Sequence, residues 1–354
     1  MLIRCQRCLM PNTRPDTAFV DGVCSACLTH DAQLEINWKE RKNDLAKLFE
    51  RQKPNGTGFD CIVASSGGKD SHAQVLNLIK MGVRPLLVTA TTCMLTDLGR
   101  KNIDNLKRYA STIEVTPNQE VRALLNYYGF TLVGDISWPE HVAIFTAPVR
   151  MAVSLGIPLV FYGENPQAQY GGPIGAEKAC QMTRRWVSEF GGFLGLRPND
   201  MVGQPGITAA AMKEYEFPTT NQIKRAGVEA HFLGQYLGPW DSHANAELAI
   251  NAGMQWESPH ASNWWPWENL DNAMTGLHDW MMFKKYGYGR ACAQISVDIR
   301  NGKISRSAAL VILNDLEGKF PNVYAGVDIL DILYRLDLTL DQLIEIIDKF
   351  TVEH

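Results

Sequence analysis

The chain has 354 residues, 20% charged and 45% hydrophobic, and its formal net charge at pH 7 is −4. This length can bury a large core, and the composition is ordinary for a globular protein. No apolar run approaches bilayer length and no signal-peptide layout is present, so we expect a cytoplasmic protein without membrane contact. The mild acidity argues against a large nucleic-acid surface, which makes nucleic acid an unexpected partner.

The first 30 residues contain two C-x2-C pairs, which are Cys5 with Cys8 and Cys24 with Cys27. Each pair can present two thiolates to one metal ion from a tight turn, and the spacing lies in the zinc-site range. Four thiolates leave no open coordination position, so we predict a structural Zn²⁺ site in a module over residues 1–36. An iron–sulfur cluster is the competing use of these cysteines.

Residues 37–52 have apolar side chains spaced for one face of a helix, and residues 53–58 (KPNGTG) indicate a linker. Residues 59–64 form a short apolar run with β-branched side chains, which predicts a buried strand. Residues 65–68 then indicate a turn, and residues 72–81 favour a helix. The chain is therefore expected to form a strand, a glycine loop and a helix in succession.

The glycine loop has the residue types that bind a phosphate. Gly67 and Gly68 can adopt positive φ and let an anion approach the main chain, and Lys69 adds a positive charge. The helix would direct the positive end of its dipole at the same anion. The motif is neither a Walker loop nor a dinucleotide fingerprint. We predict Lys69 and Asp70 as catalytic residues, and as nucleotide-binding residues Ser65, Ser66, Gly67, Gly68, Lys69, Asp70 and Ser71.

Strand and helix patterns alternate beyond this unit. The spacing predicts right-handed βαβ units and a parallel twisted sheet in a domain over residues 59–290. The ligands of such sheets bind beyond the carboxyl ends of the strands. The expected elements are strands over 85–90, 111–115 and 155–162 and a helix over 99–109.

Three strand ends should therefore face one cleft, namely the glycine loop, residues 89–92 and residues 163–165. We expect adenine near residues 89–92, with Thr89 and Gly163 as further nucleotide-binding residues. Glu164 is a third catalytic candidate, for metal binding or substrate orientation, and a carboxylate near a helix N-cap is the equal alternative. Asn165 is predicted to bind substrate.

Residues 164–262 are rich in glycine, proline and aromatic residues and predict substrate loops or a lid. Residues 263–269 (NWWPWEN) can form a stacking wall for a sugar or base, but a buried loop or a chain–chain contact is the favoured interpretation. Residues 277–286 favour a helix.

Residues 284–306 are basic and glycine-containing, which suits phosphate or carboxylate recognition. We predict Arg290, Asp298 and Arg300 as substrate-binding residues; a hairpin-like surface loop with a structural Asp298–Arg300 contact is the alternative. The region 291–354 is expected to hold this basic substrate loop and a helical C-terminal part. Its expected helices are residues 305–317 and residues 339–350, the second with a capping box.

Several motifs of the chain are informative together: the cysteine pairs, Ser66–Ser71, YGEN (162–165), ENL (268–270), GLHD (276–279), KYGYGR (285–290) and DIR (298–300). With these motifs the chain resembles the N-acetyl sugar amidotransferase family of PP-loop ATPases, also called N-type ATP pyrophosphatases, over nearly its full length. Gln169 departs from the pattern at a position where an acidic residue is expected.

The resemblance implies an α/β fold of the PP-loop, or adenine nucleotide alpha hydrolase-like, type. It also implies an AMP-forming enzyme that adenylates the amide oxygen of an N-acetyl group on a bacterial surface-polysaccharide sugar. Ammonia would then replace that oxygen and give an acetamidino group. The implied cofactors are ATP and Mg²⁺, and the implied substrate is a sugar nucleotide.

Ammonia needs a source, and no Cys–His–Glu glutaminase arrangement is evident in the chain. The resemblance implies a separate glutaminase and a synthase-like partner protein. The oligomeric state is left open between a monomer and a homo-oligomer.

Two other functions stay open. A tRNA-thiolating PP-loop enzyme would use cysteines near the ATP cleft, and Cys61, Cys93 and Cys292 keep this alternative open, although lone cysteines are commonly buried apolar residues. A zinc-organised scaffold with a vestigial nucleotide loop is the non-enzymatic alternative, against which the intact loop motif argues.

Overall fold

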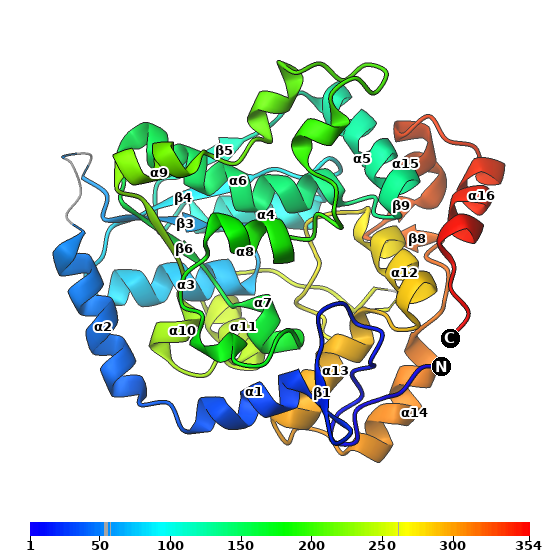
Figure 1. Cartoon of the computed structure of the whole chain (residues 1–354), viewed down its shortest axis with the longest axis horizontal. Coiled ribbons are helices and arrows are strands. Elements are labelled where there is room, and N and C mark those ends of the chain that lie inside the picture. Colours follow the sequence, from blue (N-terminus) through cyan, green and yellow to red (C-terminus); the bar gives the residue numbers. More distant parts are fainter. Residues whose placement is uncertain (53–55, 57, 261) are drawn as a thin grey trace.

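The computed structural model describes residues 1–52, 56, 58–260 and 262–354, so the linker expected over residues 53–58 lies mostly outside the described residues. A parallel sheet with strand order β5-β4-β3-β6-β7 forms the centre of the molecule (Figure 1). The predicted α/β fold with a parallel sheet is therefore confirmed. The strands are β3 (Cys61–Ala64), β4 (Pro85–Ala90), β5 (Thr112–Val115), β6 (Leu159–Tyr162) and β7 (Glu229–Phe232).

Successive residues of a strand point to opposite sides of the sheet, so both faces carry apolar side chains. Helices cover both faces. Cys61 and Val63 of β3 pack in one core with α2 (Trp38–Arg51) and α3 (Lys69–Lys80). Ile62 packs in the opposite core with α5 (Gln119–Val133) and α6 (Trp138–Leu155). The uninterrupted apolar runs of the strands reflect this burial on both faces.

The direction of strand addition reverses at β3. From β3 the chain proceeds to β4 and β5 on one side, and then to β6 and β7 on the other. The carboxyl ends of β3 and β6 therefore lie at a topological switch point, where doubly wound sheets bind their ligands. The glycine loop follows β3 and Glu164 follows β6, so this crevice receives both.

Element bounds differ from the expected ones at several places. Helix α3 begins at Lys69, directly after the glycine loop, and α4 spans Asp97–Leu106. Strand β6 is shorter than predicted because α6 continues to Leu155 and ends at Gly156, which has a φ of 68°. Strand β7 lies in the stretch for which we expected loops. That stretch also contains α7 (Pro166–Tyr170), α8 (Arg184–Phe190), α9 (Thr220–Ala226), α10 (Gly234–Leu237), α11 (Ser242–Asn251) and short 3-10 turns over Ala176–Lys178, Pro198–Met201 and Ala211–Glu214.

The basic segment expected as a substrate loop is mostly a helix, α13 (Arg290–Arg300). Its buried apolar side chains include Ala291 and Ile295, which face the core at helical spacing, and this burial explains the departure. Helix α14 (Arg306–Leu316) follows and packs against α13.

The N-terminal module packs on these two helices, as Figure 1 shows for the dark blue and orange segments. The module contains β1 (Phe19–Val20), β2 (Val23–Cys24) and α1 (Ser25–Leu34). The Arg306 guanidinium donates to the carbonyls of Cys5 and Cys8, so α14 holds the first cysteine turn directly. Residues near the two ends of the chain lie close to Gly287, where a Cβ would be 2.7 Å from Leu2 Cδ1 and 2.8 Å from His354 Cδ2.

The C-terminal helices form another apolar cluster with α5 and α12 (Thr275–Tyr286). The capping box of the last helix is confirmed, because Thr339 accepts from the Gln342 amide and the Gln342 side chain accepts from the Thr339 amide. In the described residues, the structure contains no helix with the length and apolar character required to traverse a bilayer. The remaining elements are β8 (Val323–Tyr324), β9 (Val327–Asp328), α15 (Ile329–Arg335) and α16 (Leu340–Phe350).

Candidate functional site

The glycine loop connects β3 to α3 and lies against α4. Gly67 has a φ of 87°, and a Cβ at this position would lie 2.8 Å from Ile103 Cγ1 and 2.9 Å from the Ile103 amide nitrogen. Only glycine fits such a position without strain. The Ser66 amide donates to Ser71 Oγ at 3.0 Å, which closes the turn onto the first helical residues. The N-terminus of α3, with its positive dipole end, therefore opens onto the crevice.

Lys69 is a buried cation between two carboxylates. Its Nζ donates to Asp70 Oδ2 at 2.7 Å and to Glu268 Oε1, and only 3% of its surface is exposed. Burial opposes the charge, but Asp70 and Glu268 raise the pKa of Lys69 well above its usual range. A bound phosphate can replace either carboxylate as the partner of this cation.

A cavity of about 510 Å³ lies in front of the loop. It is lined by residues from the glycine loop, the ends of β6 and α4, helix α6, the segment 267–271, the N-terminal module and the start of α13. Such a volume lies within the range of small-molecule sites. The polar residues among those that line it include Arg14, Ser66, Lys69, Asp70, Asn102, His141, Glu164, Tyr170, Glu268, Asp271 and Arg290.

Glu164 lines this cavity with an altered ionisation. Burial, and then the nearby Asp70 carboxylate, raise the pKa of Glu164 to about 7, while Lys69 acts in the opposite direction. A carboxyl group held near neutral pH next to other carboxylates is ready to exchange its proton for a cation.

Glu268 comes from the tryptophan-rich segment. Its Oε2 accepts from Gln294 Nε2 at 2.8 Å, and Gln294 Oε1 in turn accepts from the backbone amides of Trp264 and Trp265. Burial opposes it, but Lys69 and Gln294 hold the pKa of Glu268 below its usual value. Helix α13 therefore fixes the carboxylate that faces Lys69.

The tryptophans themselves are mostly structural. Trp265 is buried, and the indole N–H groups of Trp264 and Trp265 both donate to Asp298 Oδ2, at 2.7 and 2.9 Å. The favoured interpretation of this segment as a buried loop is confirmed for Trp265. Trp267 instead lines the cavity, where it can stack on a ring of a bound molecule.

The cavity brings together part of the set predicted from the sequence. Ser65, Ser71, Thr89 and Gly163 do not line it: Ser65 is buried in the loop, Ser71 is buried on α3, Thr89 is buried in β4, and Gly163 packs on Trp240. The adenine position near residues 89–92 stays a prediction. The members that do line the cavity are Ser66, Gly67, Gly68, Lys69, Asp70, Glu164 and Arg290.

The four predicted substrate-binding residues have different surroundings. Arg290 faces the cavity and forms a bidentate ion pair with Asp279, at 2.8 and 3.1 Å. Asn165 is buried and caps α7 through the Gln167 amide. Asp298 accepts from the tryptophans, and Arg300 donates to the carbonyl of Gln169 at 2.7 Å, away from the glycine loop. A substrate role for the last three stays a prediction.

The sequence analysis missed Arg14, His141 and Glu268 as cavity residues. Glu268 and its neighbours were quoted only as a motif, although a carboxylate between tryptophans and Asn269 is an unusual polar signal. Arg14 lies in the N-terminal module, where the cysteines were the only residues predicted to have a role. Its Nε donates to the Gly171 carbonyl at 3.2 Å. His141 lies in the first turn of α6, which has a proline near its start, and no local pattern connects it to the cleft.

The lone cysteines lie outside the cavity. Cys61 and Cys292 are buried, and burial raises the pKa of both thiols above the usual value. Cys93 is half-buried, and its pKa is also raised by burial. None of the three lines the cavity described above, so the observation that kept tRNA thiolation open gains no support.

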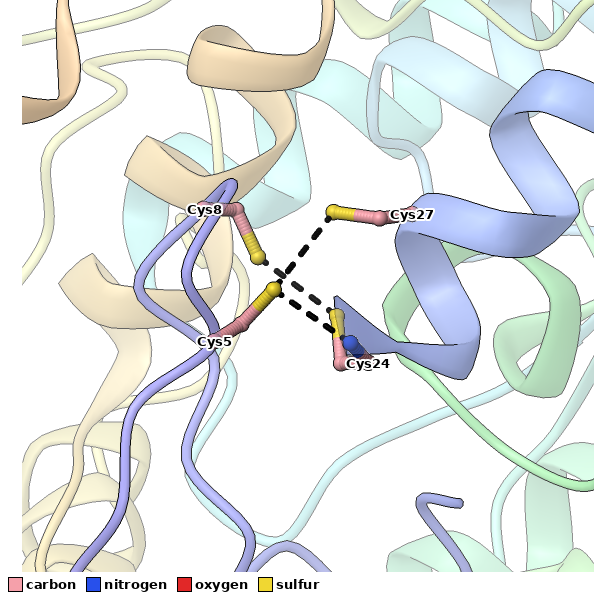
Figure 2. Close-up of side chains that lie close together, drawn as sticks. All are labelled: Cys5, Cys8, Cys24 and Cys27. Carbon is pink, nitrogen blue, oxygen red and sulfur yellow. Dashed lines mark hydrogen bonds between the residues drawn. The ribbon is translucent and has the colours of Figure 1, made fainter. Parts of the chain in front are cut away.

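The N-terminal cysteines converge as a metal site requires. Figure 2 shows the four thiols pointing at one another, from the first turn and from the start of α1. Cys5 Sγ lies 3.9 Å from Cys27 Sγ, and Cys8 Sγ lies 3.6 Å from Cys24 Sγ. Tetrahedral Zn²⁺ with bonds of about 2.3 Å requires sulfur separations of roughly 3.8 Å. The four buried cysteines therefore fit a structural zinc ion.

Comparison with known protein families finds a match in the C-terminal region of the chain. The family described as "LPS biosynthesis protein WbpG-like, C-terminal domain" matches residues 260–354. The matched region contains the ENL, GLHD, KYGYGR and DIR motifs on which the resemblance inferred from the sequence partly rests. The NMN synthetase from Francisella tularensis is a structural neighbour with 11% identity and a TM-score of 0.30, covering 64% of this chain and 99% of its own. A search of curated proteins finds no match.

Proposed function

We propose that this chain, a PP-loop protein with a WbpG-like C-terminal domain, is an ATP-dependent amidotransferase acting on a bacterial surface-polysaccharide sugar. It would convert an acetamido group into an acetamidino group and release AMP and pyrophosphate. The observation that carries the proposal is the glycine loop at the switch point, with Lys69 and a set of carboxylates facing one cavity.

The reaction takes two steps. The amide oxygen attacks the α-phosphorus of ATP, the bond to the β-phosphate breaks, and pyrophosphate leaves. Ammonia then adds to the amide carbon, the carbon–oxygen bond breaks, and AMP departs with the former amide oxygen. The product is an amidinium group, which retains a proton at neutral pH.

The loop residues match the first step. Pyrophosphate develops negative charge as it leaves, and the amides at the start of α3 together with Lys69 can stabilise that charge. Lys69 would exchange its carboxylate partners for phosphate oxygens. Since Gly67 touches α4, the loop is already fixed in the conformation that this role requires.

The carboxylates match a divalent cation. Asp70 and Glu164 line the same cavity, and oxygen ligands of this kind suit Mg²⁺. Bound with ATP, Mg²⁺ supplies neutralisation of charge on the phosphates. The raised pKa of Glu164 means that the pocket resists an extra negative charge until a cation enters.

The sugar would occupy the part of the cavity that faces α13. Arg290 donates to Asp279 through Nε and Nη2. Its Nη1 has no hydrogen-bond partner among the described residues and can therefore bind an oxygen of the substrate. Trp267 offers a ring face to a sugar or base. Holding the amide oxygen in line with the α-phosphorus supplies the remaining rate enhancement.

The ammonia is proposed to come from a separate glutaminase and a synthase-like partner protein. A sugar nucleotide, with the carrier and sugar undefined, is the proposed substrate, and we propose the cytoplasm as the site of the reaction because ATP is available there.

The direct test is mass spectrometry of N-acetylated sugar nucleotides after incubation with the protein, ATP, Mg²⁺ and ammonium. Exchange of an amide oxygen for NH has a distinctive mass change, and transfer of sulfur has a different one. Formation of the acetamidino sugar supports the proposal. Thiolated RNA together with unchanged sugars would favour the thiolation alternative instead.

A further inference from the structure

A second cavity, of about 400 Å³, adjoins the first. The two share Arg14, His141, Phe190 and Gly192 in their walls. The second cavity lies between α6, α12 and the segment after α8, and no role for it follows from the nucleotide loop. Its wall contains a compact group of metal-ligating side chains: Asp135, His141 and His278.

These three side chains come from segments that the fold brings together. Asp135 lies between α5 and α6 and is 4% exposed, His141 lies on the first turn of α6, and His278 lies on α12. Their candidate ligand atoms all lie within 4.8 Å of one another. Gly192 lies against the His141 ring, since a Cβ at Gly192 would lie 3.1 Å from His141 Nδ1.

The distances are those between ligands of one ion. His141 Nδ1 lies 3.0 Å from Asp135 Oδ2, and His278 Nδ1 lies 2.8 Å from Asp135 Oδ1. Bonds of about 2.0 to 2.2 Å to a divalent ion bring neighbouring ligand atoms to roughly 3 Å. The aspartate thus lies between two imidazole nitrogens, as a shared ligand set requires.

The ring nitrogen Nδ1 of His141 is buried and has no hydrogen-bond partner among the described residues. It lies close to the Asp135 carboxylate, but the two groups are not aligned for a hydrogen bond. A buried ring nitrogen without a partner is uncommon, and a ligand is one of the causes. Two ligands of one metal approach each other in this way because both lone pairs point at the ion.

The surrounding charges do not neutralise Asp135. Lys285 donates to the Val133 carbonyl at 2.7 Å, and Arg290 is paired with Asp279. Glu140, one residue before His141, pairs with Arg122 at 3.0 Å. The Asp135 carboxylate accepts from the Ser137 backbone amide at 2.9 Å, and its side-chain partners are the two histidines, on the wall of an open cavity.

We propose that Asp135, His141 and His278 bind one divalent transition-metal ion, separate from the cysteine site. Two imidazoles and one carboxylate suit zinc-class ions and leave coordination positions open. The open positions would face the second cavity, where an oxygen or nitrogen atom of a bound molecule could complete the coordination. This site does not depend on the proposed amidotransferase reaction.

The test is metal content, measured without ATP or sugar. The full-length protein, stripped with a chelator, reloaded with Zn²⁺ and desalted, should retain about two equivalents per chain. The variants His278→Ala and Asp135→Asn should each retain about one equivalent, at the cysteine site. Cys27→Ser should lose the ion at the cysteine site and retain the one at the Asp135–His141–His278 site. His260→Ala removes a histidine that pairs with Glu257 at 2.8 Å elsewhere and should retain both.

Loading with Co²⁺ distinguishes the two sites by chemistry. Thiolate ligands give an intense sulfur-to-metal charge-transfer absorption, which an imidazole–carboxylate site does not. His278→Ala and Asp135→Asn should lose only the weak ligand-field bands of the second ion, and should keep the thiolate band as evidence of folding. One equivalent in the unaltered protein, or two in each of His278→Ala and Asp135→Asn, would overturn the proposal and leave a hydrogen-bonded cluster.

Discussion

Single residues decide whether the loop can receive a phosphate. Gly67 is needed both for its φ of 87° and for its contact with the backbone of α4. Lys69 is held as a charged group in a buried position by Asp70 and Glu268. The sequence predicted the loop because its residue types act locally. It could not predict Glu268, which lies 199 positions away and meets Lys69 only after folding.

Gly67→Ala should weaken both folding and nucleotide binding. We expect a loss of about 1 to 3 kcal/mol in the free energy of unfolding, since the new Cβ meets Ile103 and φ is positive. Guanidinium denaturation measures the stability, and calorimetry measures ATP binding.

Gly82→Ala is the matched control, because Gly82 has a φ of 80° but open space around it. Gly82→Ala should therefore introduce backbone strain without a steric overlap, and the variant should still bind ATP. Equal effects of the two substitutions would mean that contact between the loop and α4 is unimportant.

Glu164 should make stability depend on pH. Its pKa is raised from 4.5 to about 7 in the folded protein, so the native state binds more protons between these values. The favourable contribution is complete below about pH 4.5 and is lost as pH rises through about 7. Glu164→Gln should therefore be more stable than the unaltered protein at pH 8, by on the order of 2 kcal/mol, and similar near pH 5.

Denaturation curves of both proteins at the two pH values give this difference. Glu317, whose pKa is also raised to about 7 by burial, titrates in both proteins and cancels. A stability difference that is independent of pH would contradict the proposed ionisation of Glu164.

At the scale of elements, the cysteine module and the C-terminal helices support the cavity together. Arg14 extends from the module to the cavity wall, with its Nη1 3.3 Å from the Tyr288 hydroxyl. The module packs on α13, which also carries Arg290 and Gln294. Loss of a metal ion held by the four cysteines would thus disturb groups at the cavity in front of the glycine loop as well as the module.

Cys27→Ser should lower the thermal unfolding midpoint and reduce AMP formation about tenfold or more, because Arg14 and α13 lose their support. Thermal scanning and a nucleotide assay measure the two effects. Cys93→Ala, which removes a half-buried thiol outside the module, should leave both values close to those of the unaltered protein. Normal activity of a metal-free Cys27→Ser variant would separate the module from catalysis.

Local sequence patterns predicted helices and strands well where the spacing of apolar residues was regular. The strand over residues 85–90 and the helices near residues 38–51 and 340–350 were predicted within one or two residues. Strand β7 is only four residues long and lies in a glycine-rich stretch, so its pairing with β6 sets its conformation. A basic substrate loop was predicted where helix α13 lies, because the prediction was based on the charged residues of this segment and not on its buried apolar face.

At the scale of the molecule, the strand order places the glycine loop and Glu164 at one crevice. The parallel sheet and its ligand edge followed from the alternation of elements, which is why the fold class could be predicted. The walls of the cavity also include residues of the N-terminal module and α13, whose approach to the sheet depends on long-range packing that no local pattern shows.

An external ammonia source makes a prediction for the purified chain. With ATP, Mg²⁺ and an accepted sugar, high ammonium should give product and glutamine alone should give none, because the cavity contains none of the chain's cysteines among the described residues. Addition of the glutaminase and synthase-like partners should restore glutamine use. Efficient use of glutamine by the single chain would contradict the need for partners.

The nucleotide product tests the central claim most directly, since a loop that binds the departing pyrophosphate must yield AMP. We predict equimolar AMP and pyrophosphate by chromatography when ATP, Mg²⁺, ammonium and an accepted sugar nucleotide are supplied. Lys69→Ala should reduce this by about 100-fold or more, whereas Lys80→Ala, at the exposed end of the same helix, should not. Release of ADP and inorganic phosphate, or full AMP formation by Lys69→Ala, would contradict the account.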